Sequence, residues 1–282
     1  MPSLAQRASA LLNVHPSHQF RRDRWFQLRY DLGYATAALG VIALVASGVF
    51  TPLFASPSRG WIAVFPFVLY AAIAAHLLVH NAGHGSFPRP WNRLAGELCG
   101  VLIAVRFVGW TLIHVRHHKY SDDRVDDPHP NFPSFFRTAL YSILQVERQL
   151  MKAYYVQWGD TPENHARERL RARVSYATTL LLFAAWAAVL GPWFFVTVFL
   201  PAQAGAALFV IHFNWVTHNG AVGRDFAPVD QDTGWFWLGN RLFAGIYMHA
   251  THHERPYLFN PLFRDKAPRA GVPGGASAAP NP

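Results

Sequence analysis

The sequence is poor in the residues on which disulfide scaffolds and thiolate metal sites depend. It has one cysteine, Cys99, among 282 residues. A lone cysteine forms no internal disulfide and cannot by itself build a thiolate zinc site. A His-Glu-x-x-His motif is also missing from the sequence, which disfavours a zinc protease that acts inside the membrane.

Charged residues are missing from three long stretches. Asp, Glu, Lys and Arg do not occur in residues 32–58, 60–88 or 174–223. A helix needs about 20 mostly apolar residues to cross a bilayer, so the first two stretches can hold one span each and the third can hold two. Gly191-Pro192 is the natural turn between the last two spans. The spans are expected near residues 33–55, 61–80, 174–190 and 193–211.

We therefore expect an all-α integral membrane protein with about four transmembrane helices. Residues 94–113 are apolar but contain Glu97 and Arg106, which favours an interfacial or re-entrant element over a full span. The tail is rich in Pro and Gly and is expected to be disordered. The expected organisation is a basic N-terminal segment, a membrane domain and this tail, at residues 1–31, 32–264 and 265–282.

The basic residues predict the orientation of the chain. Of 25 Lys and Arg residues, five precede the first span, thirteen lie between the second and third spans, and six follow the last. Cytoplasmic loops carry the excess of Lys and Arg, so we expect both termini and the active site on the cytoplasmic side. Arg outnumbers Lys 22 to 3, which is typical of a GC-rich bacterial genome and thus points to a bacterial inner membrane. The net charge of +9 then faces anionic lipid headgroups and does not indicate a nucleic-acid partner.

Histidines recur in short motifs at the expected cytoplasmic ends of the spans. Residues 114–118 read His-Val-Arg-His-His, and residues 249–253 read His-Ala-Thr-His-His. At this histidine content, about 0.04 copies of His-x-x-His-His are expected by chance. His80 and His84 lie at the end of the second span, and His218 follows the fourth. The expected fold thus carries a cytoplasmic cap that is rich in histidine.

The spacing of these histidines is typical of metal binding. Residues i and i+3 or i+4 share one face of a helix, so His80 and His84 can address one centre. Two adjacent histidines diverge by roughly 100° on a helix and can reach two metals or two sides of one. Imidazole ligands suit Zn, Cu, Fe or Ni. Nine histidines are too many for one ion, and a redox pair of irons that activates O₂ accounts best for their number.

At this point the sequence resembles a known superfamily. HNAGHGSF, HVRHH and HATHHERP resemble, in order and spacing, the three histidine boxes of the membrane fatty acid desaturases and hydroxylases. NWVTH, residues 214–218, resembles an Asn-x-x-x-His element of acyl-CoA desaturases. The resemblance covers about residues 25–262. It implies as metal ligands His80, His84, His114, His117, His118, His218, His249, His252 and His253, with Asn214 acting through a water molecule.

The resemblance also implies an activity and its partners. It implies a fatty acyl desaturase with two Fe ions as cofactor, O₂ as co-substrate, and an acyl chain on a lipid or acyl carrier as substrate. Electrons would come from a separate ferredoxin-, rubredoxin- or cytochrome b5-like protein and its reductase. An apolar channel would hold one methylene near the metals. Candidates for its wall, which could equally be ordinary interface or core aromatics, are Trp110, Phe213, Trp215 and Phe243.

Other reactions remain open at this stage. The short His-x-x-x-His form of the first box is shared by hydroxylases and many bacterial acyl-lipid desaturases. A lipid or carotenoid hydroxylase or ketolase and an alkene-forming fatty acid decarboxylase are therefore alternatives. A membrane metal transporter is an alternative from a different class. It is disfavoured because a transport path would need ligands at mid-membrane depth.

Five further polar residues lie near the motifs. Four of them have both a functional and a structural interpretation, and the fifth has no functional one. His76 and His212 could hydrogen-bond toward the metal centre or be satisfied core histidines. Asp126, or Asp127 beside it, could orient a ligand imidazole or form an Asx turn. His129, in the same Asp- and Pro-rich loop, is expected to be solvated.

Overall fold

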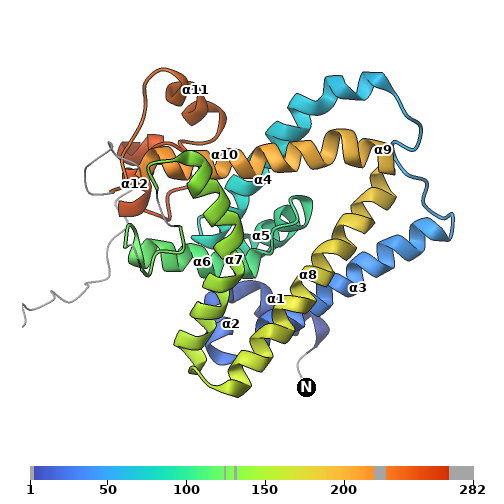
Figure 1. Cartoon of the computed structure of the whole chain (residues 1–282), viewed down its shortest axis with the longest axis horizontal. Helices are drawn as coiled ribbons and strands as arrows, with labels where there is room; N and C mark the ends of the chain where they lie inside the picture. Colours follow the sequence, from blue (N-terminus) through green and yellow to red (C-terminus); the bar gives the residue numbers. More distant parts are fainter. Residues whose placement is uncertain (1–2, 124, 130–131, 219–226, 267–282) are drawn as a thin grey trace, which may run out of the picture.

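The computed structural model describes residues 3–123, 125–129, 132–218 and 227–266, and helices are the regular secondary structure that these residues form. Within these ranges there is no β-strand, and Figure 1 shows helices joined by turns and loops. The helices before the second histidine box are α1 (Leu4–Asn13), α2 (Pro16–Arg22), α3 (Phe26–Ala46), η1 (Arg59–Val64), α4 (Phe65–Gly83) and α5 (Trp91–Leu102). Those that follow are α6 (Phe107–Tyr120), α7 (Phe135–Trp158), α8 (Pro162–Leu190), α9 (Pro192–Phe194), η2 (Phe195–Phe199), α10 (Leu200–His218), α11 (Trp235–Leu242), α12 (His249–Glu254) and η3 (Pro261–Lys266).

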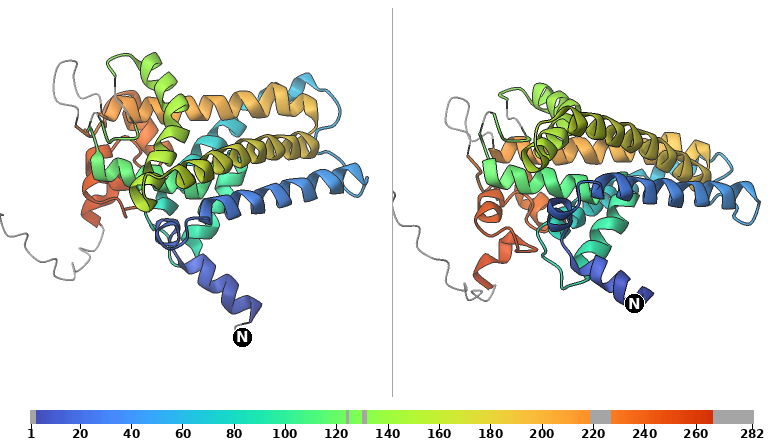
Figure 2. Two further views of the ribbon diagram at one scale, coloured as in Figure 1. Left: turned by 60° about the horizontal axis from the view of Figure 1, so that its bottom comes forward. Right: turned by 90° about the horizontal axis from the view of Figure 1, so that it is seen from below.

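Four helical stretches are long and apolar enough to cross a membrane, which confirms the expected fold class. Only 11% to 33% of the most apolar window of each stretch is buried inside the protein. Most of their apolar side chains therefore face outward, where lipid would cover them. α3 and α8 run side by side in both views of Figure 2. The four stretches are Phe26–Ala46, Arg59–Gly83, Pro162–Leu190 and Pro192–His218.

Two of the helices begin and end at residues that the apolar stretches do not predict. The first was expected at 33–55 but runs from Phe26 to Ala46. It ends early because the chain turns at Gly48, whose φ is 76°, a value that glycine adopts without strain. The third was expected to begin at residue 174, yet α8 begins at Pro162 after the Thr161 side chain caps it.

The turn between the last two spans lies where the sequence predicts it. Gly191 follows α8 with φ 85° and leads directly into Pro192. A Cβ atom at Gly191 would lie 2.6 Å from the carbonyl oxygen of Phe54, so both the backbone angle and the close approach require glycine. Here the backbone of Leu53 also donates a hydrogen bond to the carbonyl of Val189 (2.8 Å).

The segment after the second span, which contains Glu97 and Arg106, is bent and does not form one straight span, as its sequence predicts. α5 and α6 meet at an angle of 109°. A Cβ atom at Gly100 would come within 2.5 Å of the carbonyl oxygen of Val105, so the bend depends on a residue without a side chain. This geometry fits a re-entrant or broken element rather than one straight span.

Polar contacts at the start of α6 hold it against the long helices. α3 packs along α8, and α4 packs along α10. Asp31 of α3 is buried, and its carboxylate lies 2.5 Å from Nε of Arg106, the residue before α6. Ser175 of α8 donates to the same carboxylate. On the other side, Phe20 of α2 packs against Leu112 of α6. α6 is thereby fixed between the spans and the N-terminal helices.

The histidine-bearing elements gather at one end of the molecule. In Figure 1, α6, the end of α10 and α12 lie together on the left, away from the turn at α9. The metal-transporter alternative expected ligands part-way along the helices. The observed position, at helix ends, does not match that expectation.

Candidate metal centre

The first histidine box lies where α4 ends. Gly85 has φ 73°, and its backbone N–H donates to Ala82, while that of Ser86 donates to Asn81. These two bonds form the glycine-dependent motif that commonly ends a helix. His84 is thus the last residue before the chain turns, and His80 lies one helical turn before it.

The second and third boxes lie on two further helices. His114, His117 and His118 belong to the last two turns of α6. His249, the first residue of α12, is followed by His252 and His253. Asp230 stabilises α12, since its carboxylate accepts hydrogen bonds from the backbone N–H (3.0 Å) and hydroxyl (2.6 Å) of Thr251. His218 is the last residue of α10 and is fully buried.

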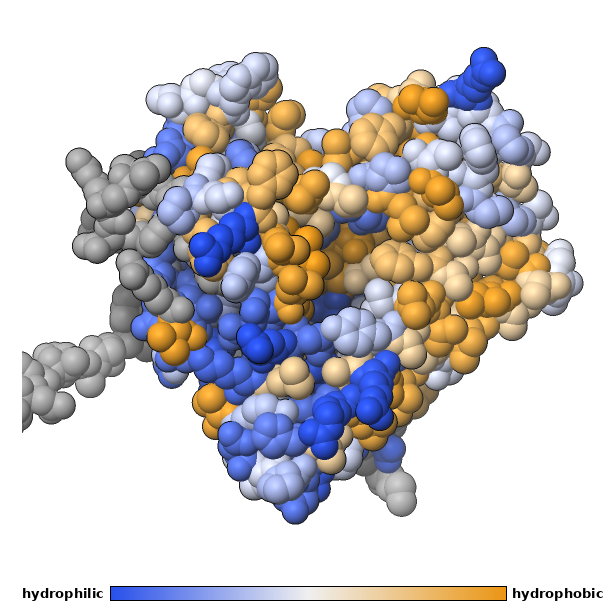
Figure 3. All heavy atoms as spheres, viewed as in Figure 1, coloured by the Kyte–Doolittle hydropathy of each residue, from blue (hydrophilic) through white to orange (hydrophobic). Residues whose placement is uncertain are grey.

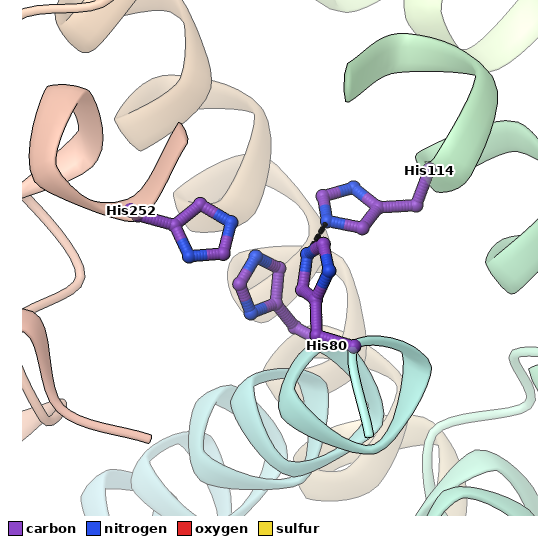
Figure 4. A group of neighbouring side chains, drawn as sticks. His80, His114 and His252 are labelled. Atoms are coloured by element: carbon purple, nitrogen blue, oxygen red, sulfur yellow. Dashed lines mark hydrogen bonds between the residues drawn. The ribbon is translucent and has the colours of Figure 1, made fainter. Parts of the chain in front are cut away.

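The structure brings eight of the nine predicted ligands into two groups of four. Within each group, one ring nitrogen per residue lies within 4.8 Å of all the others. Figure 4 shows the rings of His80, His114 and His252 turned toward one another from α4, α6 and α12. The first group is His80, His84, His114 and His252. The second group is His117, His218, His249 and His253.

The ninth predicted ligand, His118, lies beside the first group. Its Nε2 is 3.2 Å from Nε2 of His114 and 3.1 Å from Nε2 of His252. Its ring also stacks on that of His253 of the second group, with centroids 4.3 Å apart. His118 therefore lies where the two groups meet.

The two His-x-x-His-His motifs exchange one histidine each. His117, the second of the three histidines in the first motif, joins the second group. His252, the second of the three in the second motif, joins the first group. A helix turns 100° per residue, so positions i and i+4 diverge by about 40° while adjacent positions diverge by about 100°. Adjacent histidines therefore reach different groups, which selects one of the two arrangements that the spacing allowed.

The arrangement of nitrogen atoms fits metal ions better than mutual hydrogen bonding. Nε2 of His114 lies 2.6 Å from Nε2 of His84 and 3.2 Å from Nε2 of His118. A neutral imidazole nitrogen has either one N–H or one lone pair, so it cannot satisfy both neighbours. Nε2 of His117 is buried and has no hydrogen-bond partner within the described ranges. Convergent, unsatisfied lone pairs are what a cation would bind.

The protonation state of these histidines also suits metal binding. Burial, followed by repulsion from neighbouring imidazoles, lowers the pKa of His84, His249 and His252 well below the usual value. The same causes lower the pKa of His253 to about 3. These rings are therefore neutral at pH 7, and the neutral ring is the form that coordinates a metal.

Two carboxylates contact the second group, and neither is Asp126. Asp127 accepts from Nδ1 of His117 (2.8 Å), and Asp122 accepts from Nδ1 of His218 (3.0 Å). Burial raises the pKa of Asp127 to about 6, while hydrogen bonds from the backbone N–H groups of Asp122 and His129 favour its charged form. Asp126 instead pairs with Arg116 and Lys152, each at 2.8 Å. The hypothesis that Asp126 orients a ligand finds no contact to support it in the described chain, whereas its neighbour Asp127 makes such a contact.

The other polar candidates have mixed outcomes. Nδ1 of His76 donates to the Ala72 carbonyl (2.9 Å), and the ring lines the cavity described below. His212 packs against Phe135 and Trp215, and no contact joins it to either group among the residues described. Asn214 lines the cavity, as does His249.

Two histidines outside the boxes make contacts that the sequence does not predict. His129 is not a solvated loop residue, since its ring lies 5.0 Å from that of His117 and it lines the cavity. His15 donates from Nε2 to the carbonyl of Gly83 (2.8 Å), next to His84. The only signal for Asp122 and His129 was their place in the Asp-rich loop that directly follows the second box. The sequence held no signal for His15, because its partner is 68 residues away.

An apolar cavity of about 250 Å³ opens beside both groups. Its walls come from α4, α6, α7, α10 and the segment before α12, and His80, His114, His252 and His249 lie along it. Of the four aromatic candidates, Trp110 and Phe213 line the cavity, whereas Trp215 and Phe243 are not among its lining residues. Figure 3 shows a hollow between α7 and α10 that is bordered by apolar side chains.

Comparisons with known proteins agree with the geometry. A profile described as fatty acid desaturase matches residues 59–269, which include every histidine of the two groups and His118. The sn-1 stearoyl-lipid 9-desaturase of Synechocystis sp. is 28% identical over 226 residues, which cover 77% of this chain and 67% of that relative. No solved structure matches the chain.

Proposed function

The chain belongs to the fatty acid desaturase family, and from that premise we propose that it is an O₂-dependent enzyme that places a double bond in a fatty acyl chain. One observation carries this proposal: two groups of imidazoles border the same apolar cavity. The family implies an oxidoreductase and a lipid substrate. That the oxidation is a desaturation is our proposal and goes beyond family membership.

We assign the nine histidines to two irons. His80, His84, His114, His118 and His252 would hold the first iron. His117, His218, His249 and His253 would hold the second, and Asn214 would act through a water molecule. This assignment is supported by the donor set, since iron accepts all-imidazole ligation. It is also supported by burial, because a metal that handles O₂ next to an alkyl chain must be shielded from bulk water.

The two irons supply, when bound, the redox chemistry that no amino acid side chain can supply. Two hydrogens leave adjacent methylenes of the acyl chain. O₂ takes up these two hydrogens together with two electrons and two protons, and two molecules of water are released. The electrons come from a separate ferredoxin-, rubredoxin- or cytochrome b5-like protein and its reductase.

The chain's own residues hold the substrate and keep water out. Trp110 stacks on His114 with ring centroids 4.3 Å apart, and the ring of Phe213 lies edge-on to that of His249 at 5.5 Å. Both aromatics line the cavity beside these histidines, so an alkyl chain in the cavity would lie against them. Such positioning of one methylene near the reacting centre can account for a large part of the rate enhancement.

An acyl chain carried by a membrane lipid is the substrate that fits best. The border of the cavity includes Ile143 of α7, which is 62% exposed, and Leu140 and Leu144 on the same helix are also exposed. Exposed apolar side chains of this kind at a cavity mouth suit a bilayer rather than water. The Synechocystis relative bears the name of a stearoyl-lipid desaturase, which supports the same substrate class.

The proposed topology follows from the four candidate spans. A membrane domain near residues 32–264 lies between a basic N-terminal segment, 1–31, and a tail, 265–282. Most of this tail lies outside the described residues. We place both termini and the metal centre on the cytoplasmic side, because the longest basic loops of the four-span chain then lie on that side.

The test is product analysis in a bacterial host that makes defined saturated lipids and also expresses a ferredoxin and its reductase. We expect a new unsaturated fatty acid by gas chromatography with mass spectrometry. His253→Ala should abolish it. His165→Ala should not, because His165 lies on the surface and pairs with Asp160 (2.6 Å).

Other products would change the assignment. A hydroxy acid would make the protein a hydroxylase, and a terminal alkene would make it a decarboxylase. If iron-loaded protein yields no altered acyl chain in the presence of the donor, the fatty acyl substrate is refuted.

A further inference from the structure

The two groups of histidines differ in the residues that hydrogen-bond to the outer nitrogens of their rings. In the second group, Nδ1 of His117 donates to Asp127 (2.8 Å) and Nδ1 of His218 donates to Asp122 (3.0 Å). Both histidines are almost completely buried. Since each Nδ1 carries the proton, each Nε2 presents its lone pair to the centre of the group.

The loop that follows α6 is built around these two carboxylates. Asp127 accepts hydrogen bonds from the backbone N–H of Asp122 and of His129, each at 2.8 Å. Asp122 adopts a left-handed backbone, with φ 66°, and accepts from the hydroxyl of Ser121 (2.9 Å). The Asp127 carboxylate is therefore held in place by the backbone of the loop, and the Asp122 carboxylate by the hydroxyl of Ser121.

The first group has no comparable charge behind it. Nδ1 of His80 meets the amide oxygen of Asn81 at 3.1 Å. The amide nitrogen of Asn81 donates to the carbonyl of Phe259 (3.1 Å), which fixes the neutral oxygen toward His80. Within residues 3–123, 125–129, 132–218 and 227–266, no carboxylate hydrogen-bonds to His84, His114 or His252.

We propose that the two metal positions are unequal, and that the second group binds iron first and releases it last because Asp122 and Asp127 support its ligands. A carboxylate that accepts the outer N–H of a ligating imidazole orients the ring and makes its other nitrogen a stronger donor. Loss of such a partner typically lowers metal affinity by about 10- to 100-fold. The inference rests on the proposed diiron function, but its test reads metal retention and not turnover.

The experiment follows iron release from the full-length protein in detergent after addition of an excess of a chromogenic chelator. We expect two phases, each with about half of the iron. Asp122→Asn and Asp127→Asn should accelerate the slow phase by about 10- to 100-fold and leave the fast phase unchanged. Asn keeps the shape and tolerates the left-handed backbone at position 122. His80→Ala should remove the fast phase and keep the slow one.

Asp126→Asn is the matched control. It removes one carboxylate from the same loop, but that carboxylate pairs with Arg116 and Lys152. Release from this variant should match the wild type. Size-exclusion chromatography and total iron content identify any variant that has lost its fold.

Three results would overturn the inference. They are a single release phase in the wild type, an unchanged slow phase in Asp122→Asn and Asp127→Asn, or an equal acceleration in Asp126→Asn. If any of these occurs while the same preparation still forms an unsaturated product, the proposed function stands and only the inequality fails. A chain that binds no iron at all would overturn both.

Discussion

Replacing Asp31 with alanine should destabilise the protein by removing the charge that neutralises Arg106. Asp31 is 2% exposed, and its carboxylate lies 2.5 Å from Nε of Arg106, whose side chain is 23% exposed. Removing one member of a buried ion pair typically costs about 3–5 kcal/mol, because the other charge stays buried. Arg106 also donates to Thr179 (2.7 Å) and to the Ser175 carbonyl. These contacts remain, so we expect the lower end, about 3 kcal/mol.

The assay is thermal unfolding of the purified protein in detergent. A loss of about 3 kcal/mol corresponds to a decrease in Tm of roughly 5 °C for a chain of this size. Asp31→Ala combined with Arg106→Met should recover most of this loss, because a buried pair replaced by apolar groups is often neutral. The control is Asp160→Ala, whose partner His165 is exposed and which should shift Tm by less than about 2 °C.

The reasoning would be refuted if Asp31→Ala kept the wild-type Tm, or if the double variant were no better than the single one. Either result would mean that the charge of Arg106 is neutralised by solvent and not by Asp31. Iron content offers a second measure, because Arg106 directly precedes α6, the helix that carries the second histidine box. We expect Asp31→Ala to lower the iron bound per chain, and the double variant to restore it.

Three further perturbations test other parts of the structure. Gly191→Ala should lower the free energy of unfolding by about 2 kcal/mol or more, because φ is 85° and the new Cβ would lie 2.6 Å from the carbonyl of Phe54. An unchanged Tm would contradict the conclusion that this turn requires glycine. Ala207→Trp should fill the cavity that Ala207 lines and reduce the yield of unsaturated product at least tenfold. Metal analysis should still find two irons per chain. His15→Ala should cost about 1 kcal/mol through the lost hydrogen bond to Gly83, with a smaller Tm decrease than that of Asp31→Ala. The control is His18→Ala, at an exposed position of α2.

The long helices could be predicted because their signal is local. A bilayer span needs an uncharged apolar run, and such a run is visible in residues 60–88 and 174–223 without knowledge of any contact. Helix ends were less predictable. α8 begins at Pro162 and not near 174, because charged residues such as Glu168 and Arg171 pair with each other (2.9 Å) and stay inside the helix. A search for uncharged apolar runs places the start of the span after those charges and therefore misses the first turns of the helix.

The supporting residues of the metal centre were predicted least well. Asp126 and Asp127 are adjacent and chemically identical, and the sequence holds nothing that separates them. Only the fold of the loop turns Asp127 toward His117 and Asp126 toward Lys152. Asp122 reaches His218 across 96 residues of sequence, a distance over which no motif spacing carries information.

The sequence by itself determined the number of long apolar helices, the identity of the nine histidines and the fact that they suit metal. These features depend on residue type and on helical periodicity, which act within a few residues. The tertiary structure decided how those histidines are shared, because the exchange of His117 and His252 between the groups depends on how α6 and α12 face each other. It also decided which carboxylates hydrogen-bond to which histidines. Both outcomes arise from packing between distant segments, where burial and hydrogen bonding select one partner among chemically equal neighbours.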